Sequence, residues 1–323
     1  MIFIRRILSS LLVCVVLFPV PVYAWFESGH HIIALLAFDQ LNSDEQRQLL
    51  QLLVAHPRYR EDFTPGETIE DIDRWRIGTA GYWPDIARDQ PLFNRPTWHY
   101  QLGATLILGD ADQLTIPETP GKLPLNATLE TQELYIAQAI QLCRSVLANS
   151  SSSPGDQALA LCWLAHLVAD AHQPCHAGSL YAAGLFPEGD RGANLIPTLQ
   201  RENMHALWDS LLGAEYDEAA IAQSVLAIND DPRYAKFGRK SLEDASALHP
   251  LWWLGESRAL AKEFAYSHEV LGPLEVARKE NAELPTLYLS QQYLDFAGKI
   301  AKVRAIQAGY RLAEVWRGTL AGH

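Results

Sequence analysis

Two His-x-x-x-Asp pairs are the first candidates for chemistry in this chain. His166 and Asp170 lie in LAHLVADAHQPCHAG, and His205 and Asp209 lie in ENMHALWDSLL. Residues four apart share one face of a helix, so each pair can bind one metal ion. A proline-containing turn places His176 shortly after the first pair. The alternative for each pair is an ion pair on an exposed helix face or a hydrogen-bonded core histidine.

A third stretch, GYWPDIARDQPLFNRPTWHY, adds Asp85 and His99 beside Trp83 and Trp98. It lies in a region rich in proline and glycine that predicts loops. Taken alone, Asp85 is typical of a turn aspartate and His99 of a histidine packed among aromatic rings. Both become candidate ligands only together with the two helical pairs.

The first 24 residues, MIFIRRILSSLLVCVVLFPVPVYA, have the pattern of a secretory signal peptide. A basic pair precedes an apolar run, and small residues end it. Cleavage after Ala24 would leave one domain over residues 25–323, in a secreted or periplasmic protein. No later segment is apolar enough to predict a membrane span, so we expect no stable membrane association.

That cleavage would make Trp25 the first residue and give it a free α-amine. The amine and the carbonyl oxygen of one residue can chelate a metal ion, and His30 follows five residues later. The amine has an ordinary pKa near 8, so its neutral form is accessible near neutral pH. The alternative is a tryptophan that packs the terminus, with His30 and His31 capping a helix.

The candidate ligands combine imidazole nitrogen with carboxylate oxygen, a mixture that suits zinc. They are Trp25, His30, Asp85, His99, His166, Asp170, His176, His205 and Asp209. Three Zn²⁺ against three carboxylates would leave a local charge of about +3, which would attract a phosphate.

Charge and composition narrow the function classes. The net charge is −12, and removal of Arg5 and Arg6 would leave 24 basic against 38 acidic residues, or −14. Such a chain is poorly suited to wrapping duplex nucleic acid, where Lys and Arg supply most of the affinity. Three cysteines follow the predicted cleavage site, so either one disulfide and one thiol or three thiols are possible. No protein partner is evident.

Apolar spacing of three and four residues predicts a mostly helical protein. The expected helices are 28–54, 127–148, 156–171, 200–212, 217–228, 256–268 and 286–320. Long loops are expected at 56–98, 102–125 and 174–199, and 104–108 is the one strand candidate. The fold class predicted is all-α, a single domain with long loops around a trinuclear zinc site.

The candidate ligands, in this order, resemble the zinc-dependent single-strand nuclease and 3′-nucleotidase family, of the nuclease S-one and P-one type. The resemblance covers nearly the whole mature chain and rests on jointly specific motifs. These are the Trp25 to His30 spacing, W-x-D-x-x-R (83–88), W-H-aromatic (98–100), H-x-x-x-D-x-H-Q-P-x-H (166–176), G-D-x-G-x-N (189–194) and N-x-H-x-x-W-D (203–209). It implies a helical domain with three zinc ions.

The resemblance also implies how the ligands divide. One zinc would be held by Asp85, His99, His166 and Asp170. A second would be held by Trp25, His30 and the bridging Asp170, and a third by His176, His205 and Asp209. His31 and His172 are not ligands in this pattern.

The implied reaction is phosphoester hydrolysis by a metal-activated water, on single-stranded DNA or RNA or on 3′-nucleotides. Asp170 would act by bridging two ions, Arg88 would hold the phosphate, and Tyr100 would stack on a base. Products would carry a 5′-phosphate. One position departs from the family: Leu102 stands where Asp or Asn is usual, which leaves the base preference open.

Two other classes of protein remain as alternatives. A zinc phospholipase C has a related helical fold, but it would have a longer gap after the first tryptophan and Glu in place of Asp209. A catalytically silent zinc-binding helical protein would keep the ligands without the activity.

Overall fold

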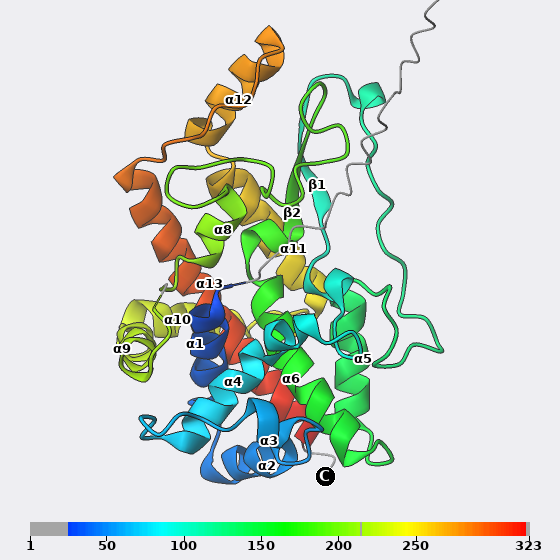
Figure 1. Cartoon of the computed structure of the whole chain (residues 1–323), viewed down its shortest axis with the longest axis vertical. Coiled ribbons are helices and arrows are strands. Elements are labelled where there is room, and N and C mark those ends of the chain that lie inside the picture. The colour runs from blue at the N-terminus through cyan, green and yellow to red at the C-terminus, as the bar shows by residue number, and fades with distance from the viewer. Residues whose placement is uncertain (1–24, 214, 321–323) are drawn as a thin grey trace, which may run out of the picture.

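Several helices surround one central helix, α6, in the computed structural model (Figure 1). The structure describes residues 25–213 and 215–320, so the predicted signal peptide lies outside the described residues. The α-helices are α1 Glu27–Phe38, α2 Ser43–Leu53, α3 Tyr59–Asp62, α4 Ile72–Ile86, α5 Ile136–Ala148, α6 Pro154–Ala171, α7 Pro174–Ala177, α8 Met204–Asp209, α9 Glu218–Asn229, α10 Pro232–Lys240, α11 Pro250–Leu260, α12 His268–Glu280 and α13 Gln291–Leu320. The shorter elements are the 3₁₀ turns η1 Ala87–Asp89, η2 Pro96–His99 and η3 Ala111–Gln113, the π-helical turn η4 Ala261–Ala265, and the strands β1 Gly103–Leu108 and β2 Gly178–Ala182. This mostly helical single domain confirms the predicted fold class.

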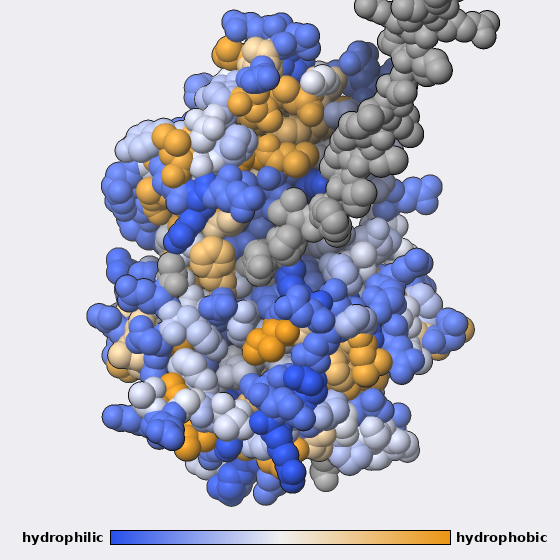
Figure 2. Space-filling model, in the orientation of Figure 1, coloured by the Kyte–Doolittle hydropathy of each residue, from blue (hydrophilic) through white to orange (hydrophobic). Residues whose placement is uncertain are grey.

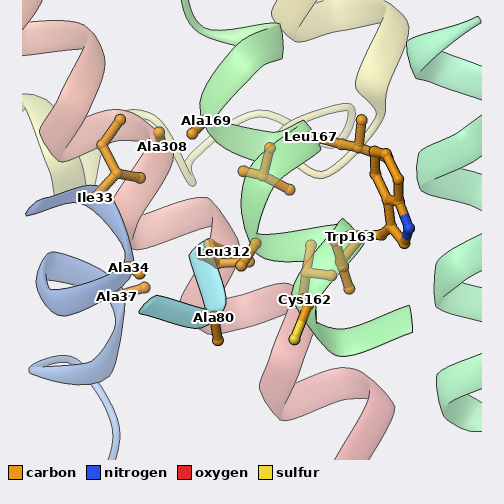
Figure 3. Packing of buried hydrophobic residues seen from close by; sticks show 14 of the residues in the cluster. Ile33, Ala34, Ala37, Ala80, Cys162, Trp163, Leu167, Ala169, Ala308 and Leu312 are labelled. Carbon is orange, nitrogen blue, oxygen red and sulfur yellow. The ribbon is translucent and has the colours of Figure 1, made fainter. Parts of the chain in front are cut away.

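Small residues let the helices approach α6 closely. Helices α1, α4, α5 and α13 all pack on it, and α1 also lies against α4 and α13. Figure 3 shows Ala34 and Ala37 of α1 beside Ala80 of α4, near Leu312 of α13. Alanine adds little bulk, so backbones come near one another, and the ends of α1, α4 and α6 meet in one place.

The prediction of one helix over 28–54 was wrong, because the chain turns between α1 and α2. Asn42 caps α2: its side chain accepts hydrogen bonds from the amides of Asp44 and Glu45, and Glu45 bonds back to the Asn42 amide. This capping box satisfies the first amides of a new helix, so it favours a break.

The prediction of a loop over 56–98 was also wrong for much of its length. It contains α3 and α4, and Asp85 lies in the last turn of α4 just after Pro84. Two glycines, Gly78 and Gly81, weaken the helical signal of this segment. Their small size is what allows α4 to pack against α1, a tertiary gain that the local sequence does not show.

Other helices differ from the prediction in their presence or their boundaries, because contacts between distant segments determine them. Helices α10 and α12 were not predicted, since α10 buries only Gly238 and α12 contains Pro273. The last helix begins at Gln291 rather than 286, because the preceding segment is extended: the Leu287 amide donates to the Pro197 carbonyl, 2.9 Å away.

The strand expected at 104–108 forms as β1, but it has a partner that was not predicted. β1 pairs in parallel with β2, which lies in the supposed loop 174–199. β2 is GSLYA and is buried along its whole length, so it shows no alternation of polar and apolar residues. This strand pairing brings together His99 and His176, which precede β1 and β2 in the sequence.

The polarity of the surface and the state of the cysteines can be compared with what the composition predicted. Most of the visible face is hydrophilic, and apolar residues gather toward the end that carries β1, β2 and α12 (Figure 2). None of the helices in the described residues has the length and apolarity needed to cross a bilayer. Cys143, Cys162 and Cys175 are buried free thiols, which decides between the two possibilities left by the sequence.

The close packing of α1 on α4 gives a test. A Cβ at Gly78 would lie 1.8 Å from Nε2 of the buried His31, so Gly78→Ala is expected to lower the free energy of unfolding by about 1–3 kcal/mol. Gly298 lies in α13 with no atom near its Cβ position, so Gly298→Ala should raise it by about 0.5–1 kcal/mol. Urea unfolding of both variants measures this, and equal effects would contradict the packing described here.

Candidate metal centre

Two helices present the His-x-x-x-Asp pairs as the sequence predicted. In α6, His166 Nε2 lies 3.2 Å from Asp170 Oδ2, and in α8, His205 Nε2 lies 3.4 Å from Asp209 Oδ2. All four side chains are buried. The alternative of an exposed ion pair therefore does not hold for either pair.

Asp85 and His99 join the α6 pair from two other elements. His99, at the end of η2, places Nδ1 2.8 Å from His166 Nε2 and 3.2 Å from Asp170 Oδ2. Asp85 Oδ1 lies 3.8 Å from His166 Nε2. These four side chains, which the family resemblance assigned to one ion, thus surround one small volume.

His30 approaches the same carboxylate from the other side. Its ring stacks on that of His166 with centroids 3.8 Å apart, and its Nε2 lies 3.3 Å from Asp170 Oδ1. Trp25 is fully buried nearby, where its indole Nε1 donates to the Ala169 carbonyl. The predicted α-amine of Trp25 depends on a cleavage that lies outside the described residues.

The third predicted set also comes together. His176 Nε2 lies 3.2 Å from His205 Nε2 and 3.9 Å from Asp209 Oδ1. In the described chain there are three groups in each of which the ligand atoms lie within 4.8 Å of one another. The groups are His30, Asp85 and His166; His99, His166 and Asp170; and His176, His205 and Asp209. His166 belongs to the first two groups, and His176 Nδ1 of the third lies 3.9 Å from Asp170 Oδ1, so the three groups adjoin one another, and each could hold a metal ion.

The polar atoms here fit a cation better than they fit one another. Among the described residues, both ring nitrogens of His30, Nε2 of His99, Oδ1 of Asp170 and Oδ2 of Asp209 are buried without a hydrogen bond. Each such group costs about 1–3 kcal/mol when left unsatisfied. Buried nitrogen and oxygen atoms that lie close together without hydrogen-bond partners are what a metal ion requires, so these residues fit the metal ions that the resemblance implied.

Burial and neighbouring side chains hold His30, His99 and Asp170 in the protonation states that a metal ion needs, whereas burial raises the pKa of the Asp209 carboxyl. It lowers the pKa of His30 to about 4 and that of His99 to about 3, so both rings are neutral at pH 7. Burial opposes ionisation of Asp170, yet His166 and His176 hold the pKa of that carboxyl well below its usual range. Without metal, the stability contributed by neutral His30 and His99 is present above pH 6.5 and is lost as the pH falls toward 4.

Backbone carbonyls orient three of the histidines. Nδ1 of His166 lies 2.9 Å from the Gly81 carbonyl, Nδ1 of His205 lies 2.6 Å from that of Gly192, and Nδ1 of His176 lies 2.6 Å from that of His99. A proton on Nδ1 leaves Nε2 as the lone-pair donor. Gly81 and Gly192 were not predicted as functional residues.

The loop that supplies the Gly192 carbonyl is held in an unusual conformation. Gly189, Arg191, Gly192 and Ala193 all have positive φ, and a Cβ at Gly192 would lie 2.2 Å from the Cys175 carbonyl. The buried Asp190 fixes the loop through Ser179, the Leu180 amide and Tyr266. The G-D-x-G-x-N motif marked this loop in the sequence, but the sequence did not show that the loop orients His205.

His31 and His172 are turned away from the centre, as expected. His31 Nδ1 lies 3.2 Å from the Tyr216 hydroxyl. His172 donates from Nδ1 to the Val168 carbonyl, and its Nε2 accepts from Arg311 at 2.9 Å. Both rings are therefore part of the supporting structure.

Three further residues named from the sequence lie around the ligands. Arg88, in η1, pairs with Asp85 at 2.6 Å and is partly exposed. Tyr100 is half-buried, and its ring lies 6.3 Å from that of Tyr135. Leu102 packs near Gly192, so this position carries no polar group toward the loop that orients His205.

A buried cluster of histidines and aspartates in a helical domain is typical of a metal-binding protein. Comparison with family models identifies the family: the chain matches S1/P1 Nuclease over residues 25–321 and belongs to that family. Comparison with curated proteins finds no match. The protein is therefore a nuclease, a hydrolase of nucleic-acid phosphoester bonds, in a family of metal-dependent enzymes.

Metal binding is expected to stabilise the fold. Zinc in 1,000-fold excess over its Kd should raise the free energy of unfolding of metal-free protein by about 4 kcal/mol at pH 7. The gain should shrink toward pH 4, because, against the effect of its burial, Asp170 and Asp85 raise the pKa of His166, and this ring must lose its proton to bind. Thermal unfolding with and without zinc measures both effects.

Matched variants show whether the gain comes from this centre. His205→Gln should reduce the stabilisation by zinc, whereas His268→Gln, at an exposed position of α12, should leave it unchanged. Stabilisation by zinc that is equal in the two variants would place the metal elsewhere.

Proposed function

We propose that this protein is a zinc-dependent nuclease that cleaves single-stranded DNA and RNA to 5′-phosphorylated products. The same centre would release phosphate from 3′-nucleotides. One observation carries the proposal: three groups of buried His and Asp ligand atoms converge in a chain of the S1/P1 nuclease family.

Zinc is proposed because the donors are imidazole nitrogens and carboxylate oxygens without an additional oxygen-rich shell. Asp85, His99, His166 and Asp170 would hold one ion. Trp25, His30 and Asp170 would hold the second, and the third would bind His176, His205 and Asp209. Bound zinc supplies a Lewis acid and lowers the pKa of water.

Asp170 and Arg88 are the residues to which we assign catalytic roles. Asp170 is fully buried and faces His30 with one oxygen and His99 and His166 with the other, which suits a bridging carboxylate. Arg88 is partly exposed beside Asp85, so its guanidinium can hold a phosphate as negative charge develops.

A preference for single strands follows from the proposed role of Tyr100. Its half-buried ring is a stacking surface directly after His99, and a base in a duplex cannot leave its own stack without a cost of a few kcal/mol. Burial raises the pKa of Tyr100, so the hydroxyl stays protonated at neutral pH.

We also propose that the enzyme is exported and cleaved after Ala24, which makes it secreted or periplasmic. The contacts of residue 25 support this. The Phe26 amide donates to the Asp209 carbonyl at 3.1 Å, and the Trp25 indole is anchored on α6. These bonds hold the backbone of Trp25 close to the candidate ligands, where a new α-amine could bind a metal ion.

The substrate range can be tested directly. Metal-loaded protein should hydrolyse single-stranded DNA and RNA faster than duplex DNA, and should release phosphate from 3′-AMP. Hydrolysis of phosphatidylcholine alone would support a phospholipase C-like enzyme instead. Bound zinc without hydrolysis of any of these would indicate a silent binding protein.

In the same assay, Arg88→Ala should lower kcat by about 10²–10³-fold with bound zinc retained, because a phosphate contact is lost while every ligand remains. Arg88→Lys is the control, since it keeps the charge and should retain more activity. An unchanged kcat in the alanine variant would remove Arg88 from the mechanism.

The role of the terminus has its own test. Protein beginning at Trp25 should bind one more metal ion per chain than protein with one alanine added before Trp25, because the extra residue removes the chelating amine. Elemental analysis measures the metal, and circular dichroism checks the fold. Equal metal content and equal turnover would contradict the proposed N-terminal ligand.

A further inference from the structure

A pocket of about 380 Å³ opens beside the metal centre and has no assigned role. Its walls include Phe26, Glu27, Tyr82 and Tyr216 together with two candidate ligands, Trp25 and Asp85. We call it the N-terminal pocket, because α1 begins in it. Tyr100, the stacking residue proposed above, does not line it, so the pocket is a separate site next to the same reacting centre.

Interactions with the surrounding structure hold the aromatic walls in place. The Tyr82 hydroxyl donates to Glu27 Oε1 at 2.8 Å, and the Tyr216 hydroxyl lies 3.2 Å from His31 Nδ1. The rings of Tyr82 and Tyr216 lie 5.9 Å apart. A pocket of this size with fixed aromatic walls suits a planar heterocycle.

The charges inside the pocket select the kind of heterocycle. Glu27 and Asp85 line it, which disfavours a phosphate inside but favours groups that donate hydrogen bonds. The exposed Glu27 carboxylate uses Oε1 for Tyr82 and has a second oxygen, Oε2. A carboxylate offers about four lone-pair positions, so it can accept two parallel N–H groups as well.

A positive charge stands near the mouth of the pocket. The Arg201 guanidinium lies over the Phe26 ring, 5.4 Å from its centroid, and Arg201 Nε lies 3.4 Å from Ser210 Oγ, next to Asp209 in sequence. Arg201 is exposed and can contact a backbone phosphate. A chain with its base in the pocket could thus place a phosphate beside Arg201.

We propose that the N-terminal pocket binds the nucleobase on the 5′-phosphate side of the scissile bond, and that Glu27 makes it prefer guanine. This rests on the proposed nuclease function. Guanine presents N1–H and an amino group side by side, which matches a carboxylate. Thymine and uracil present an N–H between two carbonyl oxygens, which the carboxylate repels. A 3′-mononucleotide lacks this second base and does not use the pocket.

The test compares the dinucleotides d(TpG) and d(TpT) with 3′-TMP as substrates of metal-loaded protein. The wild type should have a KM about tenfold lower for d(TpG) than for d(TpT). Glu27→Gln should raise the KM for d(TpG) by about tenfold and leave 3′-TMP unchanged, since loss of a charged hydrogen bond costs about 1.5 kcal/mol. Glu27 is exposed, so this variant should fold.

A second variant separates the aromatic wall from the carboxylate. Tyr216→Leu should raise the KM of both dinucleotides, with 3′-TMP again unchanged, whereas Tyr216→Phe should retain the wild-type KM for both. Equilibrium dialysis of the product 5′-dGMP gives a readout besides turnover: wild type should bind it more tightly than 5′-dTMP, and Glu27→Gln should remove the difference.

The outcomes also separate this proposal from the function it rests on. If the wild type hydrolyses d(TpG), d(TpT) and 3′-TMP but Glu27→Gln and Tyr216→Leu change no KM, the pocket is not a base site and the nuclease proposal stands. If the wild type hydrolyses none of the three, both proposals fall.

Discussion

The structure depends on one constraint: buried lone pairs of five histidines and three aspartates must face one another in a small volume. In a protein interior, such atoms are costly unless a proton or a cation lies between them. Asp170 is the centre of the arrangement, since it meets His30, His99 and His166 within about 3.3 Å. Everything around it serves either to bring ligands to this carboxylate or to keep their lone pairs turned inward.

The helix packing follows from that requirement. α6 brings two ligands in one turn, while α1 and α4 must lie against it closely enough to add His30 and Asp85. Glycine and alanine at the crossings allow this approach. The hydrogen bond from His166 to the Gly81 carbonyl shows that the same close contact also sets the orientation of the ring. Packing and ligand geometry are therefore one feature of the fold.

The ligands on the far side of the centre are positioned in a different way. There, β1 and β2 bring η2 beside α7, and the loop 189–193 adopts left-handed backbone conformations to present a carbonyl to His205. Strain of this kind persists only where the surroundings enforce it, and Asp190 with its three hydrogen bonds does so. The buried Asp190 therefore positions the loop that orients His205.

The sequence by itself predicted the helical class and two His-x-x-x-Asp pairs, because spacings of three and four residues define a helix face, while the nine candidate ligands and their division were implied by the resemblance to a family. It failed for α4, α12 and β2, where glycine, proline or uniform burial masks the local pattern. Only the tertiary structure decided how residues from α1, α4, η2, α6 and α8 meet, which carbonyls orient the rings, and that a pocket adjoins the centre. Those features depend on contacts between distant segments, and the local spacing of residues does not predict such contacts.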